Sequence, residues 1–324
     1  MVANFQVYWE RTRPKLDAAL QRQISLLLKN IPLKQTEALM ATLEAGKKIR
    51  GCLACLISDA LGGEMEAATL RAVAIELIQA ATLIHDDFVD QDRLRGKRPS
   101  AWTLEGARRA VLIGDIMFAS AIKMMNDLSR DDGRAVSQAI AQVSRGALHE
   151  PLDPLMLAEE IEGNRFKNEF YDKVIQLKTG ILFGTACQLG ALAAGADGDL
   201  GKVSFRYGLR IGEAYQMADD LKEVEHHLGQ LYIPPEKMAA LVPALLYFVP
   251  DLRPHLLTHL RGASPDLKAA EAEFFRAAAR MMKQEIEQRL EAAVSAMTGF
   301  FPENEYSAVM LQAPWDLIRM FNES

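Results

Sequence analysis

The sequence has few cysteines and no evident targeting or membrane-spanning segment. Its 324 residues include three cysteines, Cys52, Cys55 and Cys187, which are too few for a disulfide framework and are typical of a reducing compartment. The first residues lack the basic region and following apolar stretch of a signal peptide. No continuous apolar run reaches about 18 residues, the length needed to cross a bilayer. We therefore expect a cytoplasmic protein with no membrane span.

Charge of one sign is not concentrated anywhere in the chain. There are 37 basic and 43 acidic side chains, which give a net charge of −6, and no block of like charges. A nucleic-acid-binding protein usually has a basic patch, so we expect no nucleic-acid partner. Linkers rich in Pro, Gly or Ser and internal repeats are also missing. The sequence therefore predicts a single domain over residues 1–324.

Alternating β-branched residues bounded by hairpin turns are absent, and helical periodicity is continuous. Apolar residues repeat at spacings of three and four, and the chain is predicted to be all-α. Long irregular connections are expected at 150–165 and 225–235. Helices are predicted over 4–29, 34–45, 49–61, 65–90, 105–128, 134–149, 168–195, 199–224, 235–248 and 266–297.

A cluster of carboxylates ends the apolar helix predicted over 65–90. Asp86 and Asp90 lie one turn apart on the same helix face, and Asp87 lies between them. Their mutual repulsion, and their unfavourable interaction with the helix dipole, is relieved either by solvation or by a hard cation. Mg²⁺ prefers carboxylate oxygens and commonly shares its coordination shell with phosphate.

A second acidic helix end repeats this arrangement. Gln216, Asp219, Asp220 and Glu223 form a stripe on the apolar helix predicted over 199–224. A solvated helix end explains one such motif alone, but two of them on the most apolar helices indicate a shared site. We therefore expect the two acidic ends to form facing walls of one cavity.

Basic groups that suit a phosphate ligand occur near both motifs. Lys47 and Arg50 lie in the segment GKKIR, Arg95 follows the first acidic cluster, and Lys178 with Thr179 interrupts an apolar helix. Arg binds phosphate in a bidentate manner and Lys as a point charge. A Lys among apolar residues either meets an anion or extends its ammonium to the surface. Together the acids and cations predict a diphosphate held by Mg²⁺.

Several segments, taken in order over residues 44–224, resemble the trans-isoprenyl diphosphate synthases, also called polyprenyl synthetases. They are GKKIR, IELIQAATLIHDDFVDQDRLRGKRPSAW, GDIMFASA, YDKVIQLKTGILF, LGALAAGA and YGLRIGEAYQMADD. The resemblance implies a single-domain helical bundle of the isoprenoid-synthase type around a deep central cavity, assembled as a homodimer. It also implies a trans-prenyltransferase that joins an allylic prenyl diphosphate head-to-tail to isopentenyl diphosphate.

The resemblance also implies roles for particular residues. Asp86, Asp90, Asp219 and Asp220 would be the metal residues for three Mg²⁺ ions, with Asp219 the ligand of the third and Asp220 close behind it. Substrate contacts would come from Arg95 and Lys178 for the allylic diphosphate, and from Lys47 and Arg50 for isopentenyl diphosphate. Thr179 and Gln216 would lie beside the reacting carbons, and Lys178 with these two would form the catalytic group.

Several positions depart from the family pattern, and most concern the acceptor. Gln79, which would contact isopentenyl diphosphate, stands where a His is usual, and Gly96 stands where a second Arg is usual. The second acidic motif ends in Glu223, and the Gly-Lys loop that normally follows it is missing. Two alternatives to chain elongation therefore stay open. One is a cyclase or a prenyltransferase with another acceptor, and the other is a non-catalytic partner subunit of an active synthase.

Product length can be argued from side-chain size. In this family, bulky aromatic residues four or five positions before the first Asp stop a short chain. Ala81 and Thr82 hold these positions here, and Ile78 lies one turn deeper. The sequence thus predicts products of about C20 or longer, provided that cavity depth follows these positions.

Overall fold

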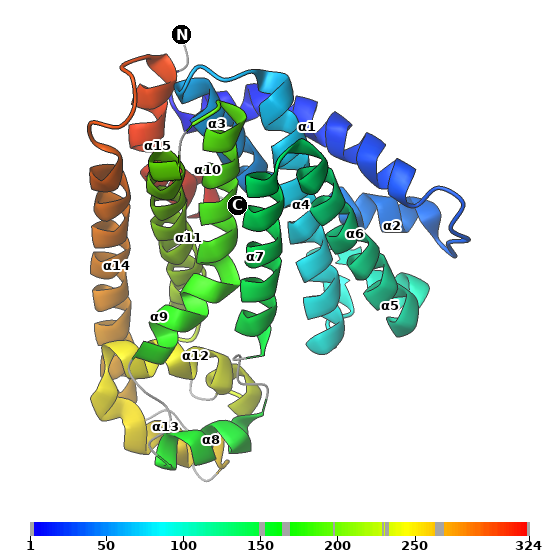
Figure 1. Cartoon of the computed structure of the whole chain (residues 1–324). Coiled ribbons are helices and arrows are strands. Elements are labelled where there is room, and N and C mark those ends of the chain that lie inside the picture. Colours follow the sequence, from blue (N-terminus) through cyan, green and yellow to red (C-terminus); the bar gives the residue numbers. More distant parts are fainter. Residues whose placement is uncertain are drawn as a thin grey trace. The chain divides into compact units, whose positions relative to one another are not determined.

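The computed structural model describes residues 3–148, 153–163, 169–196, 198–228, 230, 233–262 and 269–322. These residues are helical almost throughout, which confirms the all-α prediction (Figure 1). The first elements are α1 (Phe5–Leu27), α2 (Thr36–Leu43), α3 (Ile49–Ala60), α4 (Met65–Val89), α5 (Ala101–Glu105), α6 (Ala107–Leu128), α7 (Arg130–Ala147) and α8 (Pro154–Glu162). After them come α9 (Glu169–Ile175), the π-helical segment η1 (Gln176–Gly180), α10 (Ile181–Ala193), α11 (Gly198–His226), α12 (Pro235–Phe248), the 3-10 segment η2 (Pro250–Leu252), α13 (Arg253–Leu260), α14 (Ala269–Met297) and α15 (Glu305–Asn322).

The chain divides into two compact units, which we describe separately. Unit 1 contains Met1–Val143, Ile181–Leu209 and Ala293–Ser324, and unit 2 contains Ser144–Gly180 and Arg210–Ala292. Helices α7, α11 and α14 have residues in both units. The expectation of one domain over 1–324 stays a prediction.

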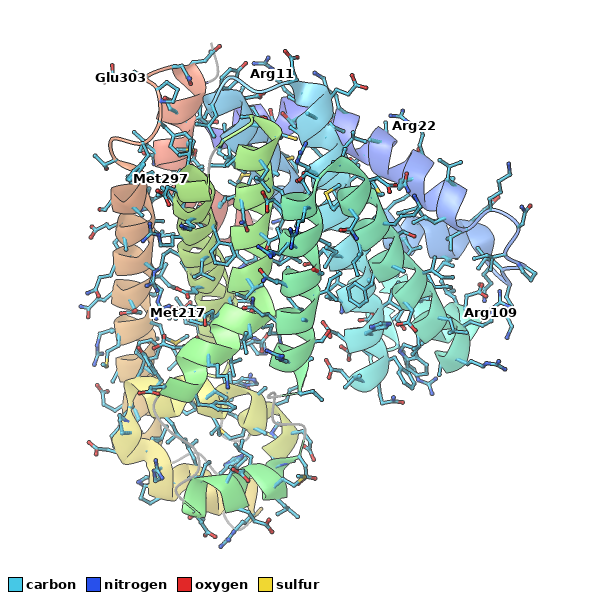
Figure 2. All side chains as sticks on the ribbon, in the orientation of Figure 1. Arg11, Arg22, Arg109, Met217, Met297 and Glu303 are labelled. Atoms are coloured by element: carbon cyan, nitrogen blue, oxygen red, sulfur yellow. The ribbon has the colours of Figure 1, made fainter. Side chains whose placement is uncertain are left out.

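Unit 1 is built around α4, which packs against α3, α6 and α10 (Figure 1). Small residues allow the close approach of α3 and α10, since a Cβ added at Gly190 would lie 2.3 Å from the carbonyl oxygen of Ala54. The outer face of α1 carries exposed cations such as Arg11 and Arg22 (Figure 2), and its inner face buries Leu16 and Leu20. The three-and-four spacing therefore predicted most of the buried face of this helix, although Trp9 and Leu27, which share that spacing, are only half-buried.

Helix α4 is long and apolar enough to cross a membrane by length and composition. The relevant segment has a mean hydropathy of 1.5, and 61% of it is buried inside the protein. Core helices of folded domains show the same pattern, so the expectation of no membrane span stays a prediction.

The expectation of an irregular connection over 150–165 was wrong in part, because α8 occupies Pro154–Glu162. The side chain of Asp153 caps this helix by accepting a hydrogen bond from the backbone N–H of Met156 at 2.9 Å, and Pro154 takes the first helical position. Helices α13 and α15 were also not predicted. In unit 2, α12 contacts α8, α9 and α13.

Candidate functional site

The first acidic motif lies at the end of α4, where a short hairpin returns the chain onto it. Gly96, with φ of +60°, makes the turn between β1 (Leu94–Arg95) and β2 (Arg98–Pro99). This turn brings the Nε of Arg95 to 2.8 Å from Oδ1 of Asp87, which is buried. Asp86 is half-buried and Asp90 is exposed. The three carboxylates thus differ in environment, and Arg95 balances the charge of the middle one.

The residues at this helix end fit a hard divalent cation. Asp86 and Asp90 project from one face, one turn apart, toward the less buried side of α4. Within the described part of the chain, no three His, Cys, Asp or Glu side chains are arranged to hold a metal ion by themselves. Mg²⁺ needs no such cluster, because it keeps several waters and is held by one or two carboxylates together with substrate phosphates.

Lys47 and Arg50, predicted to contact a diphosphate, lie at the start of α3. The Nζ of Lys47 donates to the carbonyl oxygen of Met320 in α15 at 2.9 Å. The guanidinium of Arg50 lies over the ring of Phe183 in α10, 4.6 Å from its centroid. Both side chains are half-buried, so contacts within unit 1 hold them in place.

Two buried charged residues lie next to these: Lys48, which is one of the basic groups of the GKKIR segment, and Glu76, which sequence reasoning missed. Lys48 adopts a left-handed backbone with φ of +54°, and its Nζ donates to the carbonyl oxygens of Glu44 and Ala45 at 2.7 and 2.6 Å. Glu76 accepts a hydrogen bond from the backbone N–H of Gly51 at 2.8 Å. A charged residue within an apolar helical stretch was the signal that could have identified Glu76.

Lys48 and Glu76 influence each other's ionisation. Burial raises the pKa of Glu76, and the positive charge of Lys48 opposes this effect. Burial lowers the pKa of Lys48, and the charge of Glu76 opposes that in turn. Both residues line a cavity of about 30 Å³ that Gln79, Asp87 and Arg95 also line. Gln79, predicted to contact the acceptor, therefore lies beside charged groups although it carries no charge itself.

In unit 2 the structure brings together Thr179, Gln216 and Asp220, all of which were predicted as site residues. The hydroxyl of Thr179 donates to Oε1 of Gln216 at 2.6 Å, and Nε2 of Gln216 donates to Oδ1 of Asp220 at 3.0 Å. The hydroxyl of Tyr171 donates to Oδ2 of Asp220 at 2.7 Å. Tyr171 was not predicted; its signal was a buried Tyr in α9, whose hydroxyl needs a partner.

The π-helical segment η1 contains both Lys178 and Thr179. Thr179 is buried, whereas Lys178 is exposed. Of the two alternatives that the sequence left open for Lys178, an ammonium that reaches the surface therefore agrees better with the structure than a buried cation. Single π-turns within helices occur often at functional sites. Asp219 is exposed on α11.

Hydrogen bonds and burial act in opposite directions on the second acidic motif. Burial raises the pKa of Asp220 to about 6, although the hydrogen bonds from Tyr171 and Gln216 lower it. Burial also raises the pKa of Tyr171, and the negative charge of Asp220 adds to this, so Tyr171 stays protonated and is the donor.

A buried Arg supports this part of unit 2. Arg289 in α14 donates to Glu213 at 2.7 Å, to Glu285 at 2.9 Å and to Asp172 at 2.5 Å. Burial lowers the pKa of Arg289, but the carboxylates, Glu213 first, outweigh it and raise the value above the usual range. Asp172, the residue next to Tyr171, is therefore linked directly to Arg289 of α14. Arg289 in turn links it to Glu213 of α11.

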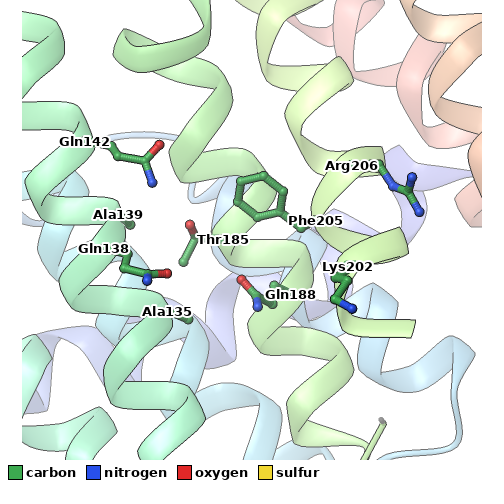
Figure 3. A pocket seen from close by; sticks show the side chains of 9 residues that line it. All are labelled: Ala135, Gln138, Ala139, Gln142, Thr185, Gln188, Lys202, Phe205 and Arg206. Carbon is green, nitrogen blue, oxygen red and sulfur yellow. The ribbon is translucent and has the colours of Figure 1, made fainter. Parts of the chain in front are cut away.

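A groove in unit 1 contains none of the predicted site residues. It has a volume of about 450 Å³ and lies between α7, α10 and α11. Figure 3 shows the amides of Gln138 and Gln142 on the α7 side and Gln188 on the α10 side, with the ring of Phe205 between the helices.

The predicted metal ligands are thus divided between the units, Asp86 and Asp90 in unit 1 and Asp219 and Asp220 in unit 2. The expectations that the acidic ends face one deep cavity, and that these residues bind metal, stay predictions.

Comparison with known proteins identifies the relatives of this chain. The Polyprenyl synthetase family model matches residues 34–230. The geranylfarnesyl diphosphate synthase of Aeropyrum pernix is 35% identical over 188 residues, which cover 54% of this chain and 57% of that protein. The heptaprenyl diphosphate synthase component 2 of Bacillus subtilis (strain 168) is 30% identical over 205 residues, which cover 61% of this chain and 56% of the relative. The similarity therefore spans a little over half the length of these relatives.

A solved structure shares the fold over nearly the whole chain. It is a polyprenyl synthase from Caulobacter crescentus CB15 complexed with calcium and isoprenyl diphosphate, with a TM-score of 0.76, 22% identity and coverage of 98% of both chains. The chain therefore has the isoprenoid-synthase fold, as the resemblance implied. Since the family model covers more than half of it, including both acidic motifs, the chain belongs to the polyprenyl synthetase family.

Proposed function

We propose that this protein is a Mg²⁺-dependent trans-prenyltransferase that joins an allylic prenyl diphosphate to isopentenyl diphosphate. The observation that carries the proposal is the helix end of α4 in a member of the polyprenyl synthetase family. There Arg95 balances the charge of Asp87, while Asp86 and Asp90 lie on the less buried side. Such a pair suits a cation that also binds phosphate.

In this proposal Asp86, Asp90 and Asp219 hold three Mg²⁺ ions, which supply positive charge for the departing diphosphate. Lys178 and Arg95 bind the allylic diphosphate. To do so, the guanidinium of Arg95 gives up its contact with Asp87 and contacts the diphosphate instead. Lys47, Arg50 and Gln79 bind the acceptor. These cations favour the transition state because negative charge grows on the leaving group.

Thr179 and Gln216 are proposed to stabilise the carbon that becomes positive. Both side chains are buried, so their dipoles act with little screening by water. The relatives named above differ in the chain length that their names state, and we propose products of about C20 or longer from the small Ala81 and Thr82. We also propose that the protein is cytoplasmic and forms a homodimer. Sedimentation of the purified protein tests the dimer.

The test is a product assay with Mg²⁺, labelled isopentenyl diphosphate and a series of allylic diphosphates from geranyl to geranylgeranyl. Elongated labelled product is the expected result. Release of diphosphate without isopentenyl diphosphate would instead support a cyclase or another acceptor. Activity only on addition of a homologous synthase would support a partner subunit. Asp86→Ala should abolish turnover without changing the helical circular dichroism, and full activity would contradict the metal-ligand role of Asp86.

A further inference from the structure

Four polar side chains in unit 2 form a continuous hydrogen-bond relay. It runs from the hydroxyl of Tyr171 through the carboxylate of Asp220 and the amide of Gln216 to the hydroxyl of Thr179, with distances of 2.7, 3.0 and 2.6 Å. The relay begins in α9, crosses α11 and ends in η1. It thus connects α9 and α11 to the π-helical turn that also carries Lys178.

Each group in the relay has a defined direction. An ionised carboxylate only accepts hydrogen bonds, so Asp220 requires the NH₂ group of Gln216, not its oxygen. This orientation of the amide places Oε1 of Gln216 against Thr179, which must then donate its only hydroxyl proton. The lone pairs of the Thr179 oxygen are left to face other groups.

The packing around Tyr171 fixes the start of the relay. Its side chain is 2% exposed, and its ring contacts those of Tyr247 and Phe248, with centroids 5.4 and 6.0 Å away. The adjacent Asp172 accepts from Arg289 at 2.5 Å. Tyr171 therefore has little freedom to move away from Asp220.

We propose that Tyr171 is a positioning residue that acts through Asp220 and Gln216 to orient the hydroxyl of Thr179, and that Asp220 anchors this relay and is not a metal ligand. The inference rests on the proposed prenyl transfer, because it assigns the relay a role in that reaction. Both oxygens of Asp220 already accept hydrogen bonds inside unit 2, whereas the neighbouring Asp219 is exposed.

The relay matters most when the substrate carbon becomes positive. An oriented Thr179 oxygen then presents lone pairs to that carbon without reorganisation during the reaction. Loss of the Tyr171 hydroxyl allows the Asp220 carboxylate to rotate and the Gln216 amide to follow. The chemical step should slow, while binding of the diphosphate should stay the same, because the relay does not contact it.

The first test compares Tyr171→Phe with Tyr247→Phe. Each change removes one hydroxyl that donates to a carboxylate, and each keeps the ring that packs in the same cluster. We expect Tyr171→Phe to lower kcat by about tenfold or more, because a catalytic group misplaced by about 1 Å can cost up to about a hundredfold, with KM for the allylic diphosphate within about twofold. Tyr247→Phe should stay close to the parent. Equal kinetics for the two variants would overturn the proposal.

The second test separates an anchor from a metal ligand. Asp219→Asn should raise the Mg²⁺ concentration at which inorganic pyrophosphate protects the protein from thermal unfolding. Asp220→Asn should leave that concentration unchanged. The double variant Tyr171→Phe/Asp220→Asn should be no slower than Asp220→Asn, because the two residues act as one unit. A higher Mg²⁺ requirement in Asp220→Asn would show that Asp220 is a ligand and overturn the proposal.

A readout that is independent of turnover keeps this inference distinct from the proposed function. The side-chain amide resonances of Gln216 can be identified by their loss in Gln216→Leu. They should shift in Tyr171→Phe and stay in place in Tyr247→Phe. If the parent protein elongates no substrate, the proposed function fails on that result alone. If the parent is active but the Gln216 resonances do not respond to Tyr171→Phe, the relay fails instead.

Discussion

The guanidinium of Arg95 binds the buried carboxylate of Asp87, with Nε 2.8 Å from Oδ1. Asp87 is 2% exposed, so water cannot take over this interaction. The pair reduces repulsion within the acidic motif, because the positive charge of Arg95 offsets the negative charge of Asp87. It also holds the hairpin of β1 and β2 against the end of α4.

We predict that Arg95→Gln destabilises the protein by about 1–3 kcal/mol, because it leaves the buried carboxylate of Asp87 without its charged partner. Urea unfolding followed by circular dichroism measures the change. Lys97→Gln, on the same hairpin and exposed, is the control and should have little effect. Equal stability of the two variants would show that the ion pair contributes nothing to folding.

The pH dependence of stability should reveal the buried Glu76. Burial raises the pKa of Glu76 in the folded protein, so folding favours its protonated form. Its contribution is complete below the pKa of the unfolded state and is lost as the pH rises through the folded pKa. Glu76→Gln keeps an acceptor for the Gly51 N–H and should remove this dependence. We expect the variant to gain stability relative to the parent as pH rises, and Glu66→Gln, exposed on the same helix, to show no such trend.

Two glycines inside helices of unit 1 should respond oppositely to alanine. A Cβ at Gly114 would lie 2.3 Å from Nε2 of His85, the residue before Asp86, whereas a Cβ at Gly201 meets only Cγ of Gln188 at 4.0 Å. Gly114→Ala should cost about 1–3 kcal/mol through overpacking. Gly201→Ala should raise the free energy of unfolding by about 0.5–1 kcal/mol, because Ala restricts the conformations of the unfolded chain. Denaturant unfolding measures both, and a neutral Gly114→Ala would mean that His85 moves aside without penalty.

Arg289→Met should be among the most destabilising changes in unit 2. Arg289 is 7% exposed and Glu213 is 2% exposed, and the substitution leaves Arg210, at 2.8 Å, as the remaining cationic partner of the buried Glu213. Losing a hydrogen bond to a buried charged group typically costs about 1–3 kcal/mol. Arg280→Met, on the exposed side of α14, provides the control with the same change of side chain. Thermal unfolding of the two variants at one pH makes the comparison.

Product length should respond to bulk one turn before Asp86. Thr82 is half-buried on the same face of α4 as Asp86, whereas Ala81 is fully buried. Thr82→Phe should therefore shift the products to shorter chains in the elongation assay. Thr69→Phe, far along α4, should leave the product distribution unchanged. An unaltered distribution in Thr82→Phe would show that the chain does not extend along this face.

Periodicity predicted most helices because their buried faces depend on local spacing alone. For α12 the predicted range of 235–248 matches the observed helix. The short helices α8 and α13 were missed, since each has too few turns for a clear period and is stabilised by contacts with α12. Helix α15, which contains Pro314, was also missed.

The sequence also predicted which residues form the candidate site better than it predicted which side chains contact one another. Identity and spacing placed Asp86 and Asp90 on one face, and a helix guarantees that geometry. Spacing could not show that Arg95 would bind Asp87, since a turn at Gly96 decides it. The partner of Tyr171 depends likewise on how α9 meets α11, which is tertiary information.

The C-terminal helix α15 places its last carbonyl groups within reach of a residue assigned to substrate. Lys47 donates to the carbonyl oxygen of Met320 at 2.9 Å, and Lys47 is also the ammonium that we propose for binding isopentenyl diphosphate. An ammonium has three N–H donors, so the bond to Met320 can persist when a diphosphate binds. Helix α15 thus holds the ammonium of Lys47 in one position, which reduces the side-chain entropy that acceptor binding would cost.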